Sequence, residues 1–159
     1  GLRLALADRD ARVRQAACHG VGLTADRSAV AQLLARLDDE SPRVRREAAQ
    51  ALGQLNAGEA SAGLANVAAG DDAALAHAVV LSLIETSSPE TLLALLPRAP
   101  LAGRVSVLLA LDRVASDRLP AHEVFQAIRN LDFPQRDVMV GLALRHPQWG
   151  EEASAYLTE

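Results

Sequence analysis

The chain has 159 residues, enough for one domain with a sizeable core, and its formal net charge at pH 7 is −4. This balance excludes the broad positive field that nucleic-acid binding needs. No apolar run reaches the roughly 18–20 residues of a membrane span, and the first residues lack the pattern of a signal peptide. We therefore expect a cytoplasmic protein that binds neither nucleic acid nor membrane.

Half of the residues are hydrophobic but only 3% are aromatic, so alanine, leucine and valine must fill the interior. All 16 basic residues are arginine, which is explained by a GC-rich bacterial genome. No arginine occurs between Glu47 and Pro97, so the middle of the chain is acidic. Cys18 is the single cysteine, which excludes a disulfide framework and predicts a buried structural thiol.

A period of 31 residues organises the first half of the chain. Residues 10–17 (DARVRQAA) return as residues 41–48 (SPRVRREA) and, in weaker form, as residues 72–79 (DAALAHAV). Such a period is typical of stacked helical hairpins, none of which can bury its apolar face alone. No segment alternates apolar and polar residues over the length of a strand. The sequence therefore predicts an all-α solenoid of about five stacked antiparallel helix pairs.

A shift of 31 residues aligns Leu2 with Leu33 and Leu6 with Leu37, so the first residues correspond to the end of a repeat. We expect residues 1–7 to end a truncated helix, and the single repeat domain to be a fragment of a longer chain. The predicted repeat units are residues 8–37, 38–69, 70–98, 99–131 and 132–159.

Caps and prolines mark the helix starts of the first three units. Asp10, Ser41 and Asp72 are predicted N-caps of the first helices, at about 11–22, 42–55 and 73–84. Second helices are expected at about 26–37, 58–69 and from Pro89 onward. The predicted inward faces of the first two first-helices are Val13, Ala16, Ala17, Gly20, Val21, Val44, Ala48, Ala51, Leu52 and Leu55.

Beyond Leu96 the 31-residue register fails, and only the hairpin pattern continues. Pro97 and Pro100 indicate a turn, followed by a helix at about 101–115. Further helices are predicted from Pro120 to Leu131, from Pro134 to about Arg145 with Val138, Leu142 and Ala143 inward, and from Trp149 to Leu157.

The block from Asp26 to Leu55, with Val-Arg-x-x-Ala-Ala-x-Ala-Leu-Gly at its end, closely resembles the bacterial HEAT-like repeat family. The same repeat type is found in phycobilin lyases. The resemblance implies a right-handed superhelix with first helices on the convex side and second helices lining the concave side. It also implies a ladder of contacts between neighbouring repeats, formed by the Asp or Ser cap and the Arg that follows Val. Asp10/Arg14 and Ser41/Arg45 retain these two residues, and the ladder should end at the third unit, where Ala76 replaces the Arg.

No catalytic constellation emerges from the sequence. His122-Glu123 lacks the second histidine of a zinc-protease helix. The other histidines, His19, His77 and His146, do not occupy equivalent positions of the repeat. The acids at Asp38–Glu40 and at Asp71–Asp72 fall in turns, where carboxylates cap the following helix. We therefore expect no enzyme activity, no cofactor and no metal.

Three functional hypotheses remain. The first is a non-catalytic protein-interaction scaffold that binds a protein or peptide, or another domain of the same longer chain, along its concave face. The second is a lyase-type or chaperone-type module handling a cofactor such as a bilin. The third is a nucleic-acid-binding HEAT-like module similar to alkylation-repair glycosylases, against which the few aromatics and the net charge weigh. For the first hypothesis, the predicted partner-binding residues are Arg27, Gln32, Arg36, Asn66 and Leu93.

Overall fold

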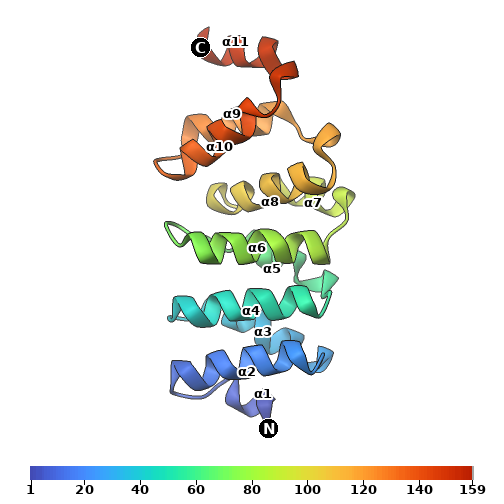
Figure 1. Cartoon of the computed structure of the whole chain (residues 1–159), viewed down its shortest axis with the longest axis vertical. Helices are drawn as coiled ribbons and strands as arrows, with labels where there is room; N and C mark the ends of the chain where they lie inside the picture. The colour runs from blue at the N-terminus through green and yellow to red at the C-terminus, as the bar shows by residue number, and fades with distance from the viewer. Residues whose placement is uncertain (159) are drawn as a thin grey trace.

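The computed structural model describes residues 1–158, and over these residues it contains helices and turns but no strand. The helices form the rungs of one column, with the two termini at opposite ends (Figure 1). The α-helices are α1 (Leu2–Ala5), α2 (Ala11–Leu23), α3 (Val30–Arg36), α4 (Pro42–Gln54), α5 (Ser61–Ala65), α6 (Ala73–Thr86), α7 (Pro89–Leu95), α8 (Leu101–Val114), α9 (Ala121–Asn130), α10 (Gln135–Leu144) and α11 (Gly150–Thr158). Short 3-10 helices cover Arg27–Ala29, Gly58–Ala60, Ser116–Arg118 and Pro147–Trp149. The predicted all-α solenoid is confirmed.

Each rung pairs a first helix with a second helix. The first helices are α2, α4, α6, α8 and α10, and the second helices are α3, α5, α7, α9 and α11. In Figure 1 the first helices of the lower rungs face the viewer, with α3 and α5 behind them. None of the helices in the described part combines the length and apolar character that crossing a bilayer requires.

The predicted caps start the helices for the expected physical reason. Asp10 accepts a hydrogen bond from the backbone N–H of Arg12 at 2.8 Å, and Asp72 accepts one from Leu75 at 2.9 Å. Ser41 makes no capping bond with its side chain, although Pro42 begins α4 as predicted. The backbone N–H of Ser41 instead donates to Asp39 at 3.0 Å, so the cap position is held from the preceding turn.

The core runs without a break along the column and is filled mainly by leucine, valine and alanine. The predicted inward face of α2 is wrong at two residues, because Val13 is 39% exposed and Ala16 is also exposed. Val44, the equivalent of Val13 in the next unit, is fully buried. The difference arises because α4 lies between two long first helices, whereas only the four-residue α1 precedes α2.

The predicted inward face of α10 is wrong at one residue. Val138 is 44% exposed, and its neighbour Met139 is fully buried together with Leu142. The helix packs mainly on α9, the second helix of the preceding pair, and only sparsely on α8. Its apolar stripe is therefore turned toward α9, and Val138 faces the space above α8.

Cys18 lies in the core, as predicted. Burial raises the pKa of its thiol to about 12, so the group stays protonated at neutral pH. A protonated, fully buried thiol acts as a small apolar side chain and not as a nucleophile.

The ladder between repeats has a different partner from the one predicted. Arg14 does not pair with the cap Asp10; its Nε and Nη2 donate to the two carboxylate oxygens of Asp39, each at 2.8 Å. Its Nη1 also donates to the carbonyl of Asp8 at 2.9 Å. Burial by itself raises the pKa of Asp39, but hydrogen bonds from Arg14 and from the backbone N–H of Ser41 bring it below its ordinary value.

The same ladder lapses one unit later. Arg45 occupies the column of Arg14, but it donates to the backbone carbonyl of Asp39 at 2.9 Å. The carboxylate that would repeat Asp39 is missing because Gly70 stands 31 residues further on. Ala76 replaces the arginine of the third unit, so the following pair, which would start from α6, lacks its arginine.

Candidate functional site

The fourth first-helix, α8, is drawn toward the layer of second helices. A Cβ atom added to Gly103 would lie 1.9 Å from the carbonyl oxygen of Ala65, so only glycine allows this approach. As a result α8 contacts α5, from which a whole helix pair separates it in the chain. The position of α8 leaves room between α6 and α10 on the face formed by the first helices.

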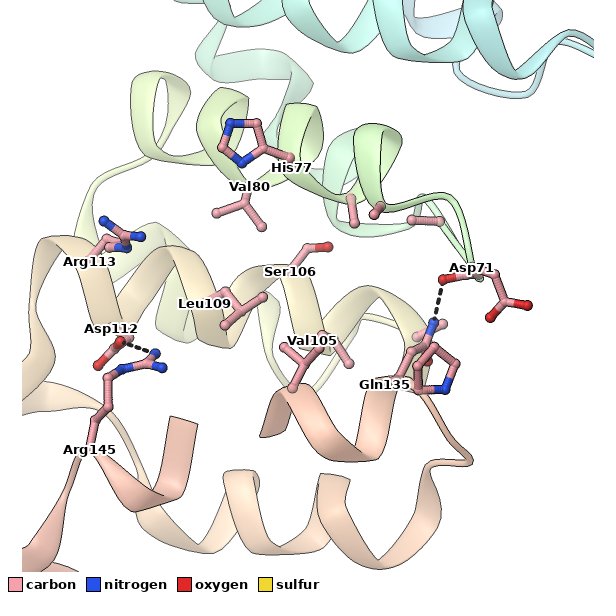
Figure 2. Close-up of a pocket in the computed structure, with 17 residues that line it drawn as sticks. Asp71, His77, Val80, Val105, Ser106, Leu109, Asp112, Arg113, Gln135 and Arg145 are labelled. Carbon is pink, nitrogen blue, oxygen red and sulfur yellow. Dashed lines mark hydrogen bonds and ion pairs between the residues drawn. The ribbon is translucent and has the colours of Figure 1, made fainter. Parts of the chain in front are cut away.

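That room is a cleft of about 750 Å³, with α8 as its floor and α6 and α10 as its walls (Figure 2). Val105 and Leu109 of α8 form the apolar floor, and Val80 of α6 faces it. Val138 of α10 also lines the cleft. A volume of this size lies within the roughly 300–1,000 Å³ that is usual for ligand sites.

Small residues keep the cleft open. Gly70 and Ala76, which replace the two members of the ladder, both line it, and so do Ala73 and Ala102. An arginine in place of Ala76 would extend over α8, as Arg14 extends from α2 toward the following turn. The lapse of the ladder and the opening of the cleft therefore have the same sequence cause.

Polar contacts attach α10 at both ends of the cleft. At one end Gln135 Nε2 donates to the carbonyl oxygen of Gly70 at 3.3 Å. At the other end Asp112 Oδ2 accepts from Arg145 Nη2 at 2.8 Å, and its Oδ1 lies 2.7 Å from His146 Nε2. Burial by itself raises the pKa of Asp112, but these two hydrogen bonds bring it below its ordinary value.

Four polar side chains of the cleft, Ser106, Arg113, Asp71 and His77, form no hydrogen bond or ion pair within residues 1–158. Ser106, on the floor, is 4% exposed, and within residues 1–158 its hydroxyl has no hydrogen-bond partner. Figure 2 shows this hydroxyl directed into the cleft. Arg113 and Asp71 lie at opposite ends, and in the same part of the chain neither side chain forms an ion pair. The hydroxyl oxygen is not closed off from the cleft, so Ser106 can form a hydrogen bond with an occupant.

The aromatic residues lie outside this cleft. Phe125 packs against Trp149 and Tyr156, with ring centroids 6.2 and 5.5 Å apart, which holds α11 on α9. His146 stacks on Trp149 at 4.2 Å. His146 is buried, because Asp112 binds its ring nitrogen and Trp149 covers its face.

The predicted partner-binding arginines are engaged by the fold. Arg27 donates to the carbonyls of Leu55 and Asn56 and lies 3.4 Å from Glu59, so it links neighbouring repeats. Arg36 forms an ion pair with Asp39 at 3.2 Å and supports the ladder.

The other three predicted residues lie apart from one another. Gln32 lines a shallow depression beside α1, Asn66 is exposed at the end of α5, and Leu93 packs partly against the core. Over residues 1–158, no hydrogen bond or ion pair joins any two of the five predicted residues. Sequence reasoning missed the cleft, although Gly70 and Ala76, both departures from the repeat, signalled it.

Acidic and histidine side chains do not converge on any one point of the described chain. Residues 1–158 contain no group of three or more histidine, cysteine, aspartate or glutamate side chains with metal-site geometry. His19 lies 2.9 Å from Glu47, and His122 lies 3.7 Å from Glu123, which also lies 3.6 Å from Arg104.

We expect Gly103→Ala to lower the free energy of unfolding by about 1–3 kcal/mol, because the new methyl group meets backbone that cannot rotate away. Urea denaturation followed by circular dichroism measures the change. Gly141→Ala on α10 is the matched control, since its Cβ would have nothing within 4 Å. The control should leave stability unchanged or raise it by up to about 1 kcal/mol. Equal effects of the two substitutions would contradict the close approach of α8 to α5.

Comparison with known proteins agrees with the geometry of the column. No curated protein matches the chain. The family model for HEAT repeats matches residues 1–84, just over half of the chain and most of the part in which the 31-residue period holds. The chain belongs to the HEAT repeat family.

Proposed function

We propose that this chain is a non-catalytic protein-interaction scaffold, and that the cleft between α6, α8 and α10 holds a peptide segment of a partner protein. HEAT repeats commonly mediate protein interactions. The observation that carries the proposal is the cleft, an apolar hollow whose floor bears the unpartnered hydroxyl of Ser106. Such a combination of apolar lining and a few convergent polar groups is typical of binding sites.

The polar residues of the cleft favour binding over catalysis. Both carboxylate oxygens of Asp112 are engaged by Arg145 and His146, so this group is not poised to exchange a proton with a substrate. HEAT repeats generally form non-catalytic scaffolds. The surface of the second helices, defined by Arg27, Gln32, Arg36, Asn66 and Leu93, is the competing location for the same function. The contacts that already engage Arg27 and Arg36 favour the cleft.

A displayed library of random heptapeptides, selected on the immobilised protein, provides the ligands for a test. The affinity of selected peptides is then measured by fluorescence anisotropy. Val138→Trp places a large side chain in the cleft from an exposed position, so binding should weaken on the order of tenfold or more. Val140→Trp is the matched control, because Val140 is 38% exposed on the same helix but does not line this cleft.

Charge reversal at Arg27 separates the two locations. If the cleft is the site, Arg27→Glu leaves the affinity of the selected peptides unchanged. If Arg27→Glu weakens binding while Val138→Trp does not, the site lies on the surface of the second helices and the proposal for the cleft is wrong. Circular dichroism of each variant verifies that the helices are retained.

A further inference from the structure

We infer that the occupant of the cleft is an extended peptide segment with an acidic residue at the Arg113 end and apolar side chains over the floor of α8. This inference rests on the proposed function and specifies the chemistry of the partner. It follows from the length of the floor, the hydroxyl of Ser106 and the distribution of charge.

The length of the floor fits a short extended segment. The cleft follows α8 from Ala102 to Arg113, which at a rise of about 1.5 Å per residue is roughly 16 Å. An extended chain covers this length with about five residues, at about 3.3 Å each. Successive side chains then point alternately toward the floor and away from it, so two or three of them meet Val105 and Leu109.

Ser106 favours an extended chain over a helix. Its hydroxyl lies among apolar residues near the middle of the floor, where an occupant must supply a polar group of its own. An extended backbone carries a free N–H and a free C=O at every residue. A helix with side chains is about 10–12 Å wide, and its backbone groups are already paired within the helix. The hydroxyl would therefore stay unsatisfied against the apolar face of a helix.

The two ends of the cleft carry opposite charges. Arg113 has no ion-pair partner among residues 1–158, and the positive charge of Arg145 beside it is balanced by Asp112. This end is thus left with one uncompensated guanidinium group, and the opposite end carries the carboxylate of Asp71. The carbonyls at the C-terminus of α8 reduce the positive field there, so recognition depends on direct contact with the guanidinium group. A carboxylate of the partner can form that charge-assisted contact.

Opposite charges at the two ends also select one direction of binding. An acidic residue placed at the Asp71 end would meet a like charge and leave Arg113 unpaired. The acidic residue of the segment therefore lies at the Arg113 end, with a neutral or basic residue some four positions away. Charge complementarity of this kind determines register and partner choice more than raw affinity.

The test uses the heptapeptide library on three proteins: the unmodified chain, Arg113→Glu, and Arg98→Glu. Arg98 is exposed in the turn after α7 and does not line the cleft, so Arg98→Glu is the matched control. Peptides from the unmodified chain and from the control should be enriched in aspartate or glutamate toward one end. Peptides from Arg113→Glu should lose that enrichment or carry lysine or arginine at that position.

The best acidic peptide and its amide analogue, with aspartate replaced by asparagine, then form a double-mutant cycle. The amide analogue should bind the unmodified chain about tenfold more weakly and should bind Arg113→Glu no more weakly than the acidic peptide does. Ser106→Ala should weaken the acidic peptide by roughly 3–10-fold, the value of one hydrogen bond. Transferred nuclear Overhauser effects should show an extended bound peptide.

The outcomes separate this inference from the proposed function. Peptides that Val138→Trp weakens but that show no acidic preference would overturn the inference and leave the cleft as a peptide site. A helical bound peptide would overturn the extended conformation. If no peptide depends on Val138, both proposals are wrong. Decanoate is the small-molecule probe, and saturable binding of decanoate without any peptide would also overturn both.

Discussion

Asp39→Ala is expected to lower the midpoint of thermal unfolding by roughly 10 °C, because it leaves the guanidinium group of Arg14 buried without its carboxylate. The side chains of Arg14 and Asp39 are only 6% and 2% exposed, so water cannot replace the lost partner. The backbone N–H of Ser41 and the side chain of Arg36 lose an acceptor as well. Differential scanning calorimetry at neutral pH measures the change.

Glu40→Ala is the matched control for this prediction. Glu40 also lies 3.2 Å from Arg14, but its side chain is 84% exposed, so its removal should shift the midpoint by no more than a few degrees. Equal shifts for the two variants would show that burial of the Arg14–Asp39 pair does not matter.

The pH dependence of the same pair has a defined sign. The pKa of Asp39 is lowered in the folded state, so its stabilising effect is fully present above the pKa of the unfolded chain, near 3.9. The effect is lost as pH falls through the lowered value. The difference in midpoint between the unmodified chain and Asp39→Ala should therefore be constant from pH 5 to pH 7 and should shrink below about pH 4. A difference that grew on acidification would contradict the assignment.

The parts of the fold that could be predicted depend on local chemistry. Asp10 and Asp72 cap helices through a side-chain oxygen and a nearby N–H, so the sequence alone places the starts of α2 and α6. The prolines at 42 and 89 mark helix starts for a similarly local reason. The 31-residue period then requires these hairpins to stack, since no single one encloses a core.

The parts that could not be predicted depend on how the helices are positioned relative to one another in the packed array. The displacement of α8 results from contact between Gly103 and the carbonyl of Ala65, two residues that no period connects. The turn of α10 that exposes Val138 follows from its preference for α9 over α8. Neither relation is visible in the spacing of apolar residues. For this reason the predicted site was assigned to the second helices, while the cleft lies among the first helices.

The candidate site and the lapse of the ladder concern the same residues. With Asp39 present and Arg14 long enough to reach it, neighbouring turns are tied together at the start of the column. Gly70 removes the carboxylate of the next pair and Ala76 removes the arginine of the pair after it, and the cleft is open beside both residues. The stabilising Arg–Asp contact is thus lost at the place where the cleft opens. Such a loss is expected where a binding site is retained at the expense of stability.

Leu52→Ala is expected to lower the free energy of unfolding by about 2–5 kcal/mol, as for other large-to-small changes in a packed interior. Leu52 is fully buried on α4, the helix that packs against both α2 and α6. Because the stability of a repeat array is close to a sum of terms between neighbours, the loss should centre on the first three helix pairs. Hydrogen exchange should show faster opening of α2, α4 and α6 than of α9 and α10.

Leu81→Ala on α6 is the matched control, since Leu81 is 45% exposed and its truncation should change stability by less than about 1 kcal/mol. An unchanged urea midpoint for Leu52→Ala would mean that α4 buries a different face.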